Sequence, residues 1–187
     1  MRNFERPTRS VAVSRHAMAA TSHPSATLCA LQIMEAGGNA MDAAIAASAM
    51  QCVVEPGSTG IGGDCFVLFA PDGSDKVIAY NGSGRTPAAL TLDWFTGRGL
   101  AEVPRQSPSA VTIPGAIDAW TRLHADHGRM PFADVLAPAI RFAEEGYAIS
   151  PRVHRDWQLE EELLASDPTA ARIFLPNGRA PKIGEVH

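Results

Sequence analysis

The stretch Gly37-Gly38-Asn39-Ala40-Met41-Asp42-Ala43-Ala44-Ile45-Ala46-Ala47 decides how this chain folds, and it runs on through Glu55-Pro56 to Gly60-Ile61-Gly62-Gly63. Alanine is the strongest helix former because it loses no side-chain entropy, and a helix with such short side chains can approach its neighbours closely. Asn39 has the side chain of a helix N-cap, and Asp42 lies in the first turn, where the helix dipole favours a carboxylate. Glu55-Pro56 ends the helix, because the residue before a proline avoids the helical conformation. The stretch therefore predicts a buried central helix that leads through a tight glycine turn into an apolar strand.

On the N-terminal side of this stretch, Val11-Ala12-Val13 and Ala17-Met18-Ala19-Ala20 are short apolar runs that suit first or edge strands of a sheet. His23-Pro24 then predicts the start of a helix, since a proline at the first helical position gives up no hydrogen bond. Gly37-Gly38 predicts where that helix ends. Its larger apolar residues recur at helical spacing: Leu28, Leu31 and Met34.

On the C-terminal side, residues 66–70 and 76–80 are β-prone runs around a Pro/Asp/Gly turn, which predicts a hairpin. Because residues 66–69 are apolar at every position, we expect that strand to be covered on both faces. Residues 173–181 predict a further strand and a tight turn. Three helical patterns lie between: one opened by Pro114-Gly115 with Ile117, Trp120 and Leu123 on one face, one at 132–145 that is bent or split at Pro138, and one at 151–164.

The order of these elements predicts a layered α+β fold. No internal repeat, charge block or low-complexity linker divides the chain, so we expect one partial domain over residues 1–187. Within it, residues 1–16 are expected to be loosely ordered, and the chain stops at His187 without a closing element.

The composition is that of an ordinary globular protein. Of 187 residues, 45% are hydrophobic and 19% are charged, and acidic and basic residues are mixed along the chain, with a formal net charge of −4. This balance argues against nucleic-acid binding. No apolar run of the length that a signal peptide needs follows the N-terminal arginines, and no apolar stretch is long enough to span a bilayer. We therefore expect a cytoplasmic protein with neither a nucleic-acid nor a membrane partner.

The glycine-rich segment 57–63 is a candidate phosphate-binding loop, but it fails the tests for one. It has no Gly-Lys-Ser/Thr ending, so it is not a Walker A loop in its usual form. A dinucleotide fingerprint would require glycine at the position that Cys65 occupies. The glycines also precede the strand, whereas both nucleotide motifs follow one. A structural turn is the better interpretation, and no cofactor is expected.

The remaining histidines, cysteines and glutamates that could react or bind a metal are better interpreted as structural residues. His124 and His127 have a spacing that can chelate a metal, but no third ligand lies near them, so no metal site is expected. The three cysteines are interpreted as small apolar core residues and not as nucleophiles or disulfide partners: Cys29, Cys52 and Cys65. Glu144-Glu145 and residues 160–162 are interpreted as solvated helix faces.

Arg85 is the candidate substrate-binding residue. It lies in a glycine-rich loop, Asn81-Gly82-Ser83-Gly84-Arg85-Thr86-Pro87, directly after a predicted strand, where substrate contacts are common. The planar guanidinium matches the geometry of a carboxylate. An ordinary surface arginine is the alternative, and at this level no nucleophile–base set can be identified, so no catalytic residue is assigned.

Residues 37–69 resemble the N-terminal region of the γ-glutamyltransferase family. The family pattern is a Gly-Gly-Asn-Ala-x-Asp-Ala-Ala helix, then a Glu-Pro and glycine-rich turn that enters an apolar strand, and this sequence has each part. From about Met18 the resemblance covers nearly the whole chain. It continues through four further segments: 112–115, 127–131, 138–147 and 173–185.

The resemblance implies an N-terminal-nucleophile hydrolase with an αββα sandwich, of which this chain is the front part of the large subunit. Family members are zymogens that cleave themselves into a large and a small subunit. The new N-terminal Thr of the small subunit attacks the amide and forms an acyl-enzyme, which water or an amino acceptor resolves. That Thr is expected downstream of His187, so the fragment alone is expected to be inactive. Its implied partners are the rest of the precursor and a small γ-glutamyl amide of the glutathione type.

Two departures from the family pattern leave the substrate open. Members that bind γ-glutamyl groups carry an Arg-Glu-x-Ala-Pro loop whose Arg holds the α-carboxylate. Aligned on Pro87, Ser83 stands at that position and Arg85 follows two residues later. Asp64-Cys65 also interrupts a turn that is all glycine in those members. The alternatives are a related amidohydrolase or acylase that acts on another carboxylate-bearing amide, and a non-catalytic truncated product.

Overall fold

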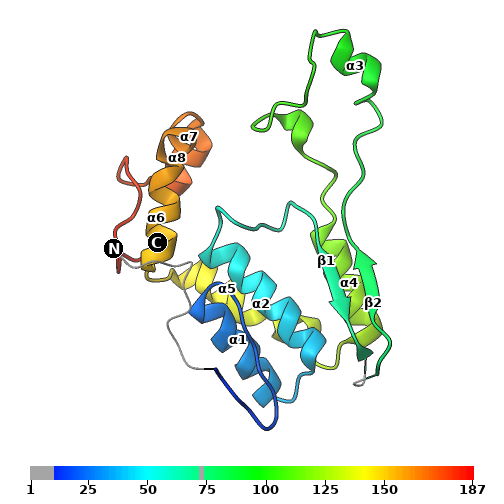
Figure 1. Ribbon diagram of the computed structural model, residues 1–187. Helices are drawn as coiled ribbons and strands as arrows, with labels where there is room; N and C mark the ends of the chain where they lie inside the picture. The colour runs from blue at the N-terminus through cyan, green and yellow to red at the C-terminus, as the bar shows by residue number, and fades with distance from the viewer. Residues whose placement is uncertain (1–10, 72–73) are drawn as a thin grey trace.

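The computed structural model describes residues 11–71 and 74–187, so the predictions for residues 1–10 lie outside the described residues. The chain forms a group of helices around α2, with a two-stranded antiparallel sheet at one side next to α4 and one long excursion between strand β2 and helix α4 (Figure 1). The elements, in chain order, are α1 Pro24–Glu35, α2 Ala40–Val54, β1 Phe66–Phe69, β2 Ile78–Asn81, α3 Leu92–Thr96, a 3-10 turn Pro108–Ala110, α4 Ala116–His127, α5 Phe132–Glu145, α6 Pro151–Leu159, α7 Glu161–Ala165 and α8 Pro168–Phe174.

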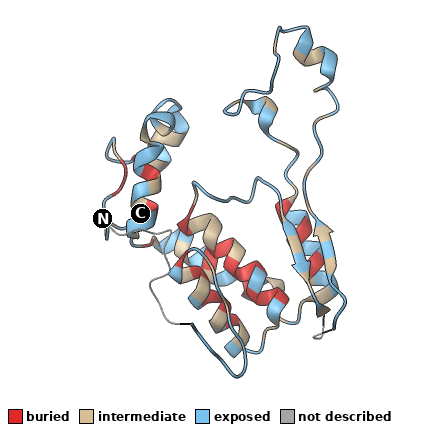
Figure 2. Cartoon of the chain, in the orientation of Figure 1, coloured by how far each residue is buried: buried red, intermediate tan, exposed pale blue. Residues whose placement is uncertain are grey.

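Helix α2 is the centre of the fold, as its sequence predicts. It packs against α1, α4 and α5, and nine of its fifteen residues are buried (Figure 2). Asn39 caps it, because its side chain accepts hydrogen bonds from the backbone N–H groups of Met41 and Asp42. The Asp42 carboxylate in turn accepts from the Asn39 N–H, which completes a capping box. The helix ends at Val54, immediately before Glu55-Pro56.

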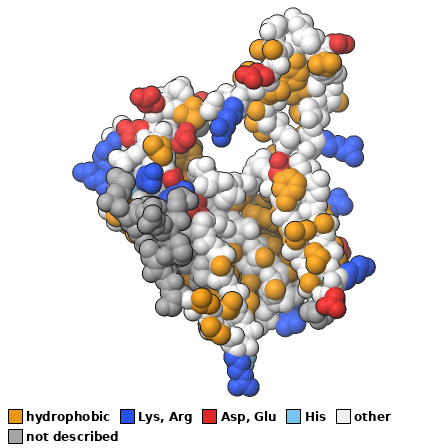
Figure 3. Space-filling model, viewed as in Figure 1, with side chains coloured by type: hydrophobic (Ala, Val, Ile, Leu, Met, Phe, Trp, Pro, Cys, Tyr) orange, Lys and Arg blue, Asp and Glu red, His pale blue; other side chains and the backbone are white. Residues whose placement is uncertain are grey.

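The hairpin forms where the sequence predicts it, but only one face of it is covered. Val67 and Phe69 of β1 pack against the core, and Phe69 meets the ring of His127 on α4 at 4.6 Å. The alternate residues point the other way, and Phe66 and Leu68 are 69% and 75% exposed. Figure 3 shows hydrophobic side chains gathered over the hairpin. The prediction that β1 is covered on both faces is therefore wrong for this chain, because α4 packs behind the hairpin and no described element lies in front of it (Figure 1).

The strands predicted before α1 are wrong, whereas the helix predicted after them is present. Residues 11–20 form no strand, and Val11 and Val13 are 90% and 89% exposed, because no described strand lies alongside to pair with them. Helix α1 begins at Pro24 and ends before Gly37, as expected. Leu28 is 55% exposed, while the face against α2 consists of Ala26, Cys29, Ala30 and Ile33.

The C-terminal helices also differ from the predictions. Helix α5 runs unbroken through Pro138, so the predicted split is absent. The pattern at 151–164 forms two helices, α6 and α7, which meet at Glu160. Ile173 and Phe174, predicted as a strand, close helix α8, because Asp167 caps that helix and Pro168 occupies its first turn. The tight turn that follows is present, with Gly178 at a φ of 68°.

Residues 82–115 form an arm that leaves the sheet after β2 and returns to α4 (Figure 1). Helix α3 on this arm buries no residue. None of the helices in the described part of the chain is long and apolar enough to cross a membrane.

Candidate functional site

Three segments meet where the hairpin joins the arm, and we call them the glycine junction: residues 62–65 before β1, 81–87 after β2, and 112–116 before α4. Gly82 N–H donates to the Cys65 carbonyl at 2.7 Å, which extends the ladder beyond the strands. The backbone N–H groups of Gly115 and Ala116 both donate to the Gly63 carbonyl at 3.0 Å. Backbone hydrogen bonds thus hold the two ends of the arm against the turn that enters β1.

Three glycines of this junction are required by close approach of neighbouring chain segments: Gly82, Gly84 and Gly115. A Cβ on Gly84 would overlap the carbonyl oxygen of Ile113, and a Cβ on Gly115 would overlap that of Gly82. A Cβ on Gly82 would lie 2.5 Å from the Cβ of Ala119 on α4. These glycines therefore allow three backbone segments to come into contact.

Asp64 connects the same three segments through its side chain. Its Oδ1 accepts a hydrogen bond from the Gly84 N–H at 3.0 Å and another from the Thr112 hydroxyl at 3.1 Å. The pKa of Asp64 is lowered from its ordinary value, mainly by the Gly84 N–H and further by the hydroxyls of Thr112 and Ser83, because these donors stabilise the charged form. In the sequence, the only signal for Asp64 is that it interrupts a turn that is all glycine in γ-glutamyl-binding members of the family.

Arg85 lies in the middle of this junction with its backbone fixed and its side chain open. Its carbonyl accepts a hydrogen bond from the Ile113 N–H at 3.0 Å. The side chain is exposed and pairs with no carboxylate among residues 11–71 and 74–187. The neighbouring Ser83 is held by a bond from its N–H to Asn81 Oδ1 at 2.9 Å. A guanidinium on a fixed backbone and with an open side chain is available to a carboxylate ligand. The substrate-binding role of Arg85 stays a prediction.

The two histidines singled out in the sequence are engaged in packing. His124 Nε2 lies 2.8 Å from the Met130 carbonyl oxygen and 3.6 Å from Asp42 Oδ1. His127 packs its ring edge against Phe69. Among the residues that the structure describes, no cluster of three or more His, Cys, Asp or Glu side chains could hold a metal ion.

All three cysteines are free thiols, and burial raises the pKa of each above its ordinary value. A raised pKa keeps a thiol protonated and therefore weakly nucleophilic. Cys29 is buried, while Cys52 and Cys65 are partly buried. These environments agree with the interpretation of the cysteines as packing residues.

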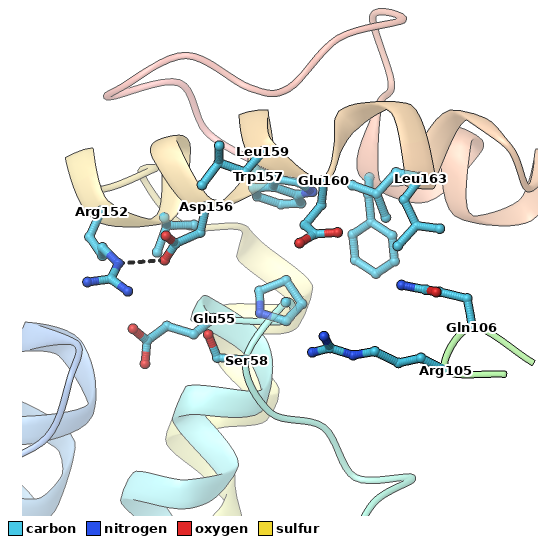
Figure 4. A pocket seen from close by; sticks show the side chains of 15 residues that line it. Glu55, Ser58, Arg105, Gln106, Arg152, Asp156, Trp157, Leu159, Glu160 and Leu163 are labelled. Atoms are coloured by element: carbon cyan, nitrogen blue, oxygen red, sulfur yellow. Dashed lines mark hydrogen bonds and ion pairs between the residues drawn. The ribbon is translucent and has the colours of Figure 1, made fainter. Parts of the chain in front are cut away.

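A second candidate site is a cavity of about 580 Å³ between the C-terminal end of α2, the arm and helices α6–α8. In Figure 4, Arg105 reaches into it from the arm toward Ser58, opposite Trp157 and Glu160 on the helices. Arg152 and Asp156 form an ion pair of 2.7 Å at its rim. No local pattern in the sequence indicates this cavity, because its lining comes from residues 55–58, 105–106 and 152–174, which only tertiary packing brings together. Arg85 does not line it.

A solved structure shows the fold class to which this chain belongs. A crystal structure of cephalosporin acylase from Bacillus halodurans matches this chain with a TM-score of 0.83 and 39% sequence identity, over 97% of this chain and 36% of that one. The fold is therefore that of an N-terminal-nucleophile hydrolase, of which this chain contains an α+β part.

The family follows from the sequence match. The chain belongs to the gamma-glutamyltranspeptidase family, whose profile matches residues 26–187. It is 40% identical to the glutathione hydrolase-like YwrD proenzyme of Bacillus subtilis over 168 residues. The matched region covers 90% of this chain and 32% of that protein. It is 35% identical over 178 residues to the oxamate amidohydrolase proenzyme of Klebsiella pneumoniae, over 92% of this chain and 33% of that protein. The chain thus spans about a third of the length of these curated relatives.

Proposed function

We propose that this chain is the front part of the large subunit of an enzyme that hydrolyses or transfers γ-glutamyl groups of glutathione-type amides. The observation that carries the proposal is the family match over residues 26–187. In the proposed mechanism, a Thr outside residues 1–187 attacks the amide carbonyl with its own α-amine as base and expels the amine product. Water or an amino acceptor then releases the acyl group. The names of the B. subtilis and K. pneumoniae relatives as proenzymes support a precursor that is cut into two subunits.

The proposed part of this chain in the reaction is recognition and support. Arg85 binds the substrate's α-carboxylate through paired N–H···O bonds, and the glycine junction holds the Arg85 backbone in place. The open face of β1 and β2 supports the proposal of a larger assembly. Phe66 and Leu68 present apolar surface that a second layer of the enzyme would remove from water.

The test is turnover of a γ-glutamyl anilide by the full-length precursor and by residues 1–187 alone. We expect activity from the precursor only, and turnover by the fragment would contradict the assignment of the nucleophile to another segment. Arg85→Ala in the full-length enzyme is expected to lower kcat/KM about 10- to 150-fold, the loss of about 1.5–3 kcal/mol for a charge-assisted contact. Arg122→Ala is the matched control, because it removes the same charge from the exposed face of α4. An unchanged kcat/KM in Arg85→Ala would show that Arg85 binds no carboxylate.

A second candidate function is an amidohydrolase or acylase of the same fold with another acyl group. It is favoured by the loop itself, in which Ser83 stands where γ-glutamyl-binding members carry the arginine. The names of the B. halodurans and K. pneumoniae relatives also point this way. Full-length kinetics on a γ-glutamyl anilide, on oxamate and on an acylated β-lactam separate the two, since the true acyl group has the highest kcat/KM. A reading frame without a downstream Thr-containing subunit would instead support a non-catalytic product.

A further inference from the structure

Asp64 accepts hydrogen bonds from the two chain segments that meet at Arg85. The residue before Arg85 is Gly84, whose N–H donates to Asp64 Oδ1 at 3.0 Å. The carbonyl of Arg85 accepts from Ile113 N–H at 3.0 Å, and the residue before Ile113 is Thr112, whose hydroxyl donates to the same Asp64 oxygen at 3.1 Å. One carboxylate oxygen therefore fixes the two strands of backbone that meet at Arg85.

The packing around this contact leaves little room for the loop to adjust. Gly84 is in such close contact with Ile113 that it has no space for a Cβ. The bond from Gly84 spans 20 residues and the bond from Thr112 spans 48, so Asp64 joins segments that are otherwise tied only by backbone bonds. Asp64 is itself exposed, so its side chain is held there by these donors and not by burial.

We propose that Asp64 is a positioning residue that sets the place of the Arg85 guanidinium and thereby determines selectivity for substrates with a carboxylate next to the acyl chain. The proposal rests on the proposed function of Arg85. A carboxylate is better suited than an amide to this position, because hydrogen bonds to an ionised acceptor are shorter and about twice as strong. The lowered pKa of Asp64 agrees with this arrangement, since it keeps the acceptor charged.

The test compares Asp64→Ala and Asp64→Asn in the full-length enzyme, with Asp75→Ala as the matched control. Asp75 is an exposed aspartate in the connection between β1 and β2. The substrates are a γ-glutamyl anilide and the 4-aminobutyryl anilide, which is the same molecule without the α-carboxylate. We expect Asp64→Ala to lower kcat/KM for the γ-glutamyl anilide about tenfold, chiefly through KM, and to leave the 4-aminobutyryl anilide unchanged. Asp64→Asn should recover part of the loss, because its amide oxygen still accepts a hydrogen bond, and Asp75→Ala should behave as wild type.

Hydrogen exchange separates the failure of this proposal from the failure of the proposed function. In Asp64→Ala, peptides that cover residues 82–87 and 111–115 are expected to exchange faster than in wild type, whatever the substrate. Unchanged exchange, or an equal loss of kcat/KM on both anilides, would overturn the positioning role. If the wild-type enzyme does not prefer the γ-glutamyl anilide, the carboxylate-binding role of Arg85 is wrong, and with it the selectivity assigned to Asp64.

Discussion

Replacing Asp42 by alanine is expected to destabilise the fold more than any other single loss of charge in the helical layer. The Asp42 side chain is fully buried at the start of α2. Its carboxylate accepts hydrogen bonds from the N–H groups of Asn39, Arg129 and Met130, at 2.9 to 3.2 Å. It therefore both caps α2 and fastens the turn between α4 and α5 to it, across 87 residues of sequence.

The magnitude follows from the donors that lose their acceptor. A buried N–H left without a partner costs about 1–3 kcal/mol. Because Asn39 and Met130 are only partly buried and Arg129 is exposed, water can reach these groups, and the lower end of the range applies to each. Asp42→Ala is thus expected to lower the free energy of unfolding by about 3 kcal/mol. For a chain of this size that corresponds to a fall in Tm of about 6–12 °C.

The assay is urea and thermal unfolding of wild type, Asp42→Ala, Asp42→Asn and Asp118→Asn, followed by circular dichroism. Asp42→Asn keeps one acceptor oxygen and is expected to fall between wild type and Asp42→Ala. Asp118→Asn is the control: Asp118 pairs with Arg122 one turn along α4, and both side chains are more than 60% exposed. Such pairs contribute about 0.5 kcal/mol or less. If Asp42→Ala costs less than 1 kcal/mol, or no more than Asp118→Asn, the account of Asp42 as the tie between α2 and the α4–α5 turn is refuted.

Two further perturbations test the backbone contacts and the pH dependence. Gly84→Ala is expected to cost about 1–3 kcal/mol in unfolding free energy, because the new Cβ would displace the Ile113 backbone, whereas Gly57→Ala has open space around it and should be near neutral; equal costs in urea unfolding would contradict the close approach. His23 caps α1 through Nδ1, which accepts from the Ser25 N–H, and burial lowers its pKa while Glu55 partly opposes the shift. Because the folded state disfavours the protonated ring, stability should be complete above pH 6.5 and fall as the pH drops through the lower folded pKa. His23→Asn keeps an N-cap acceptor without titrating, so its unfolding midpoint should vary less between pH 7 and pH 5; an identical pH dependence would refute the role of His23.

The local elements were predictable because their signals are contained in neighbouring residues. The N-cap Asn39, the first-turn Asp42 and the Glu55-Pro56 stop fix helix α2 with bonds that span four residues or fewer, and the structure has each of them. The hairpin was equally local, since its two β-prone runs lie close together in the sequence and pair in the structure. The strand predicted at Ile173-Phe174 is wrong, because the helix that starts at Asp167-Pro168 extends through both residues although their β-branched and aromatic side chains favour a strand.

The candidate site was predictable only as a single residue. The glycine-rich loop after a predicted strand indicates Arg85. The contacts of Asp64 with Gly84 and Thr112 join positions 20 and 48 residues apart, and no local pattern in the sequence encodes such contacts. The exposure of Phe66 and Leu68 was missed for the same reason, because an apolar strand has the same sequence whether or not a second layer covers it.

The sequence by itself determined helices α1, α2, α4 and α5, the Asn39 cap of α2, the hairpin and the family pattern of residues 37–69, because all of these depend on the order of neighbouring side chains. Tertiary structure alone decided which face of β1 is open, that Asp42 ties α2 to the turn between α4 and α5, and that Gly82, Gly84 and Gly115 allow three backbone segments to come into contact. The physical reason is that local propensities act over one or two turns of chain. The position of Arg85, in contrast, depends on packing and hydrogen bonds between segments that meet only once the chain has folded.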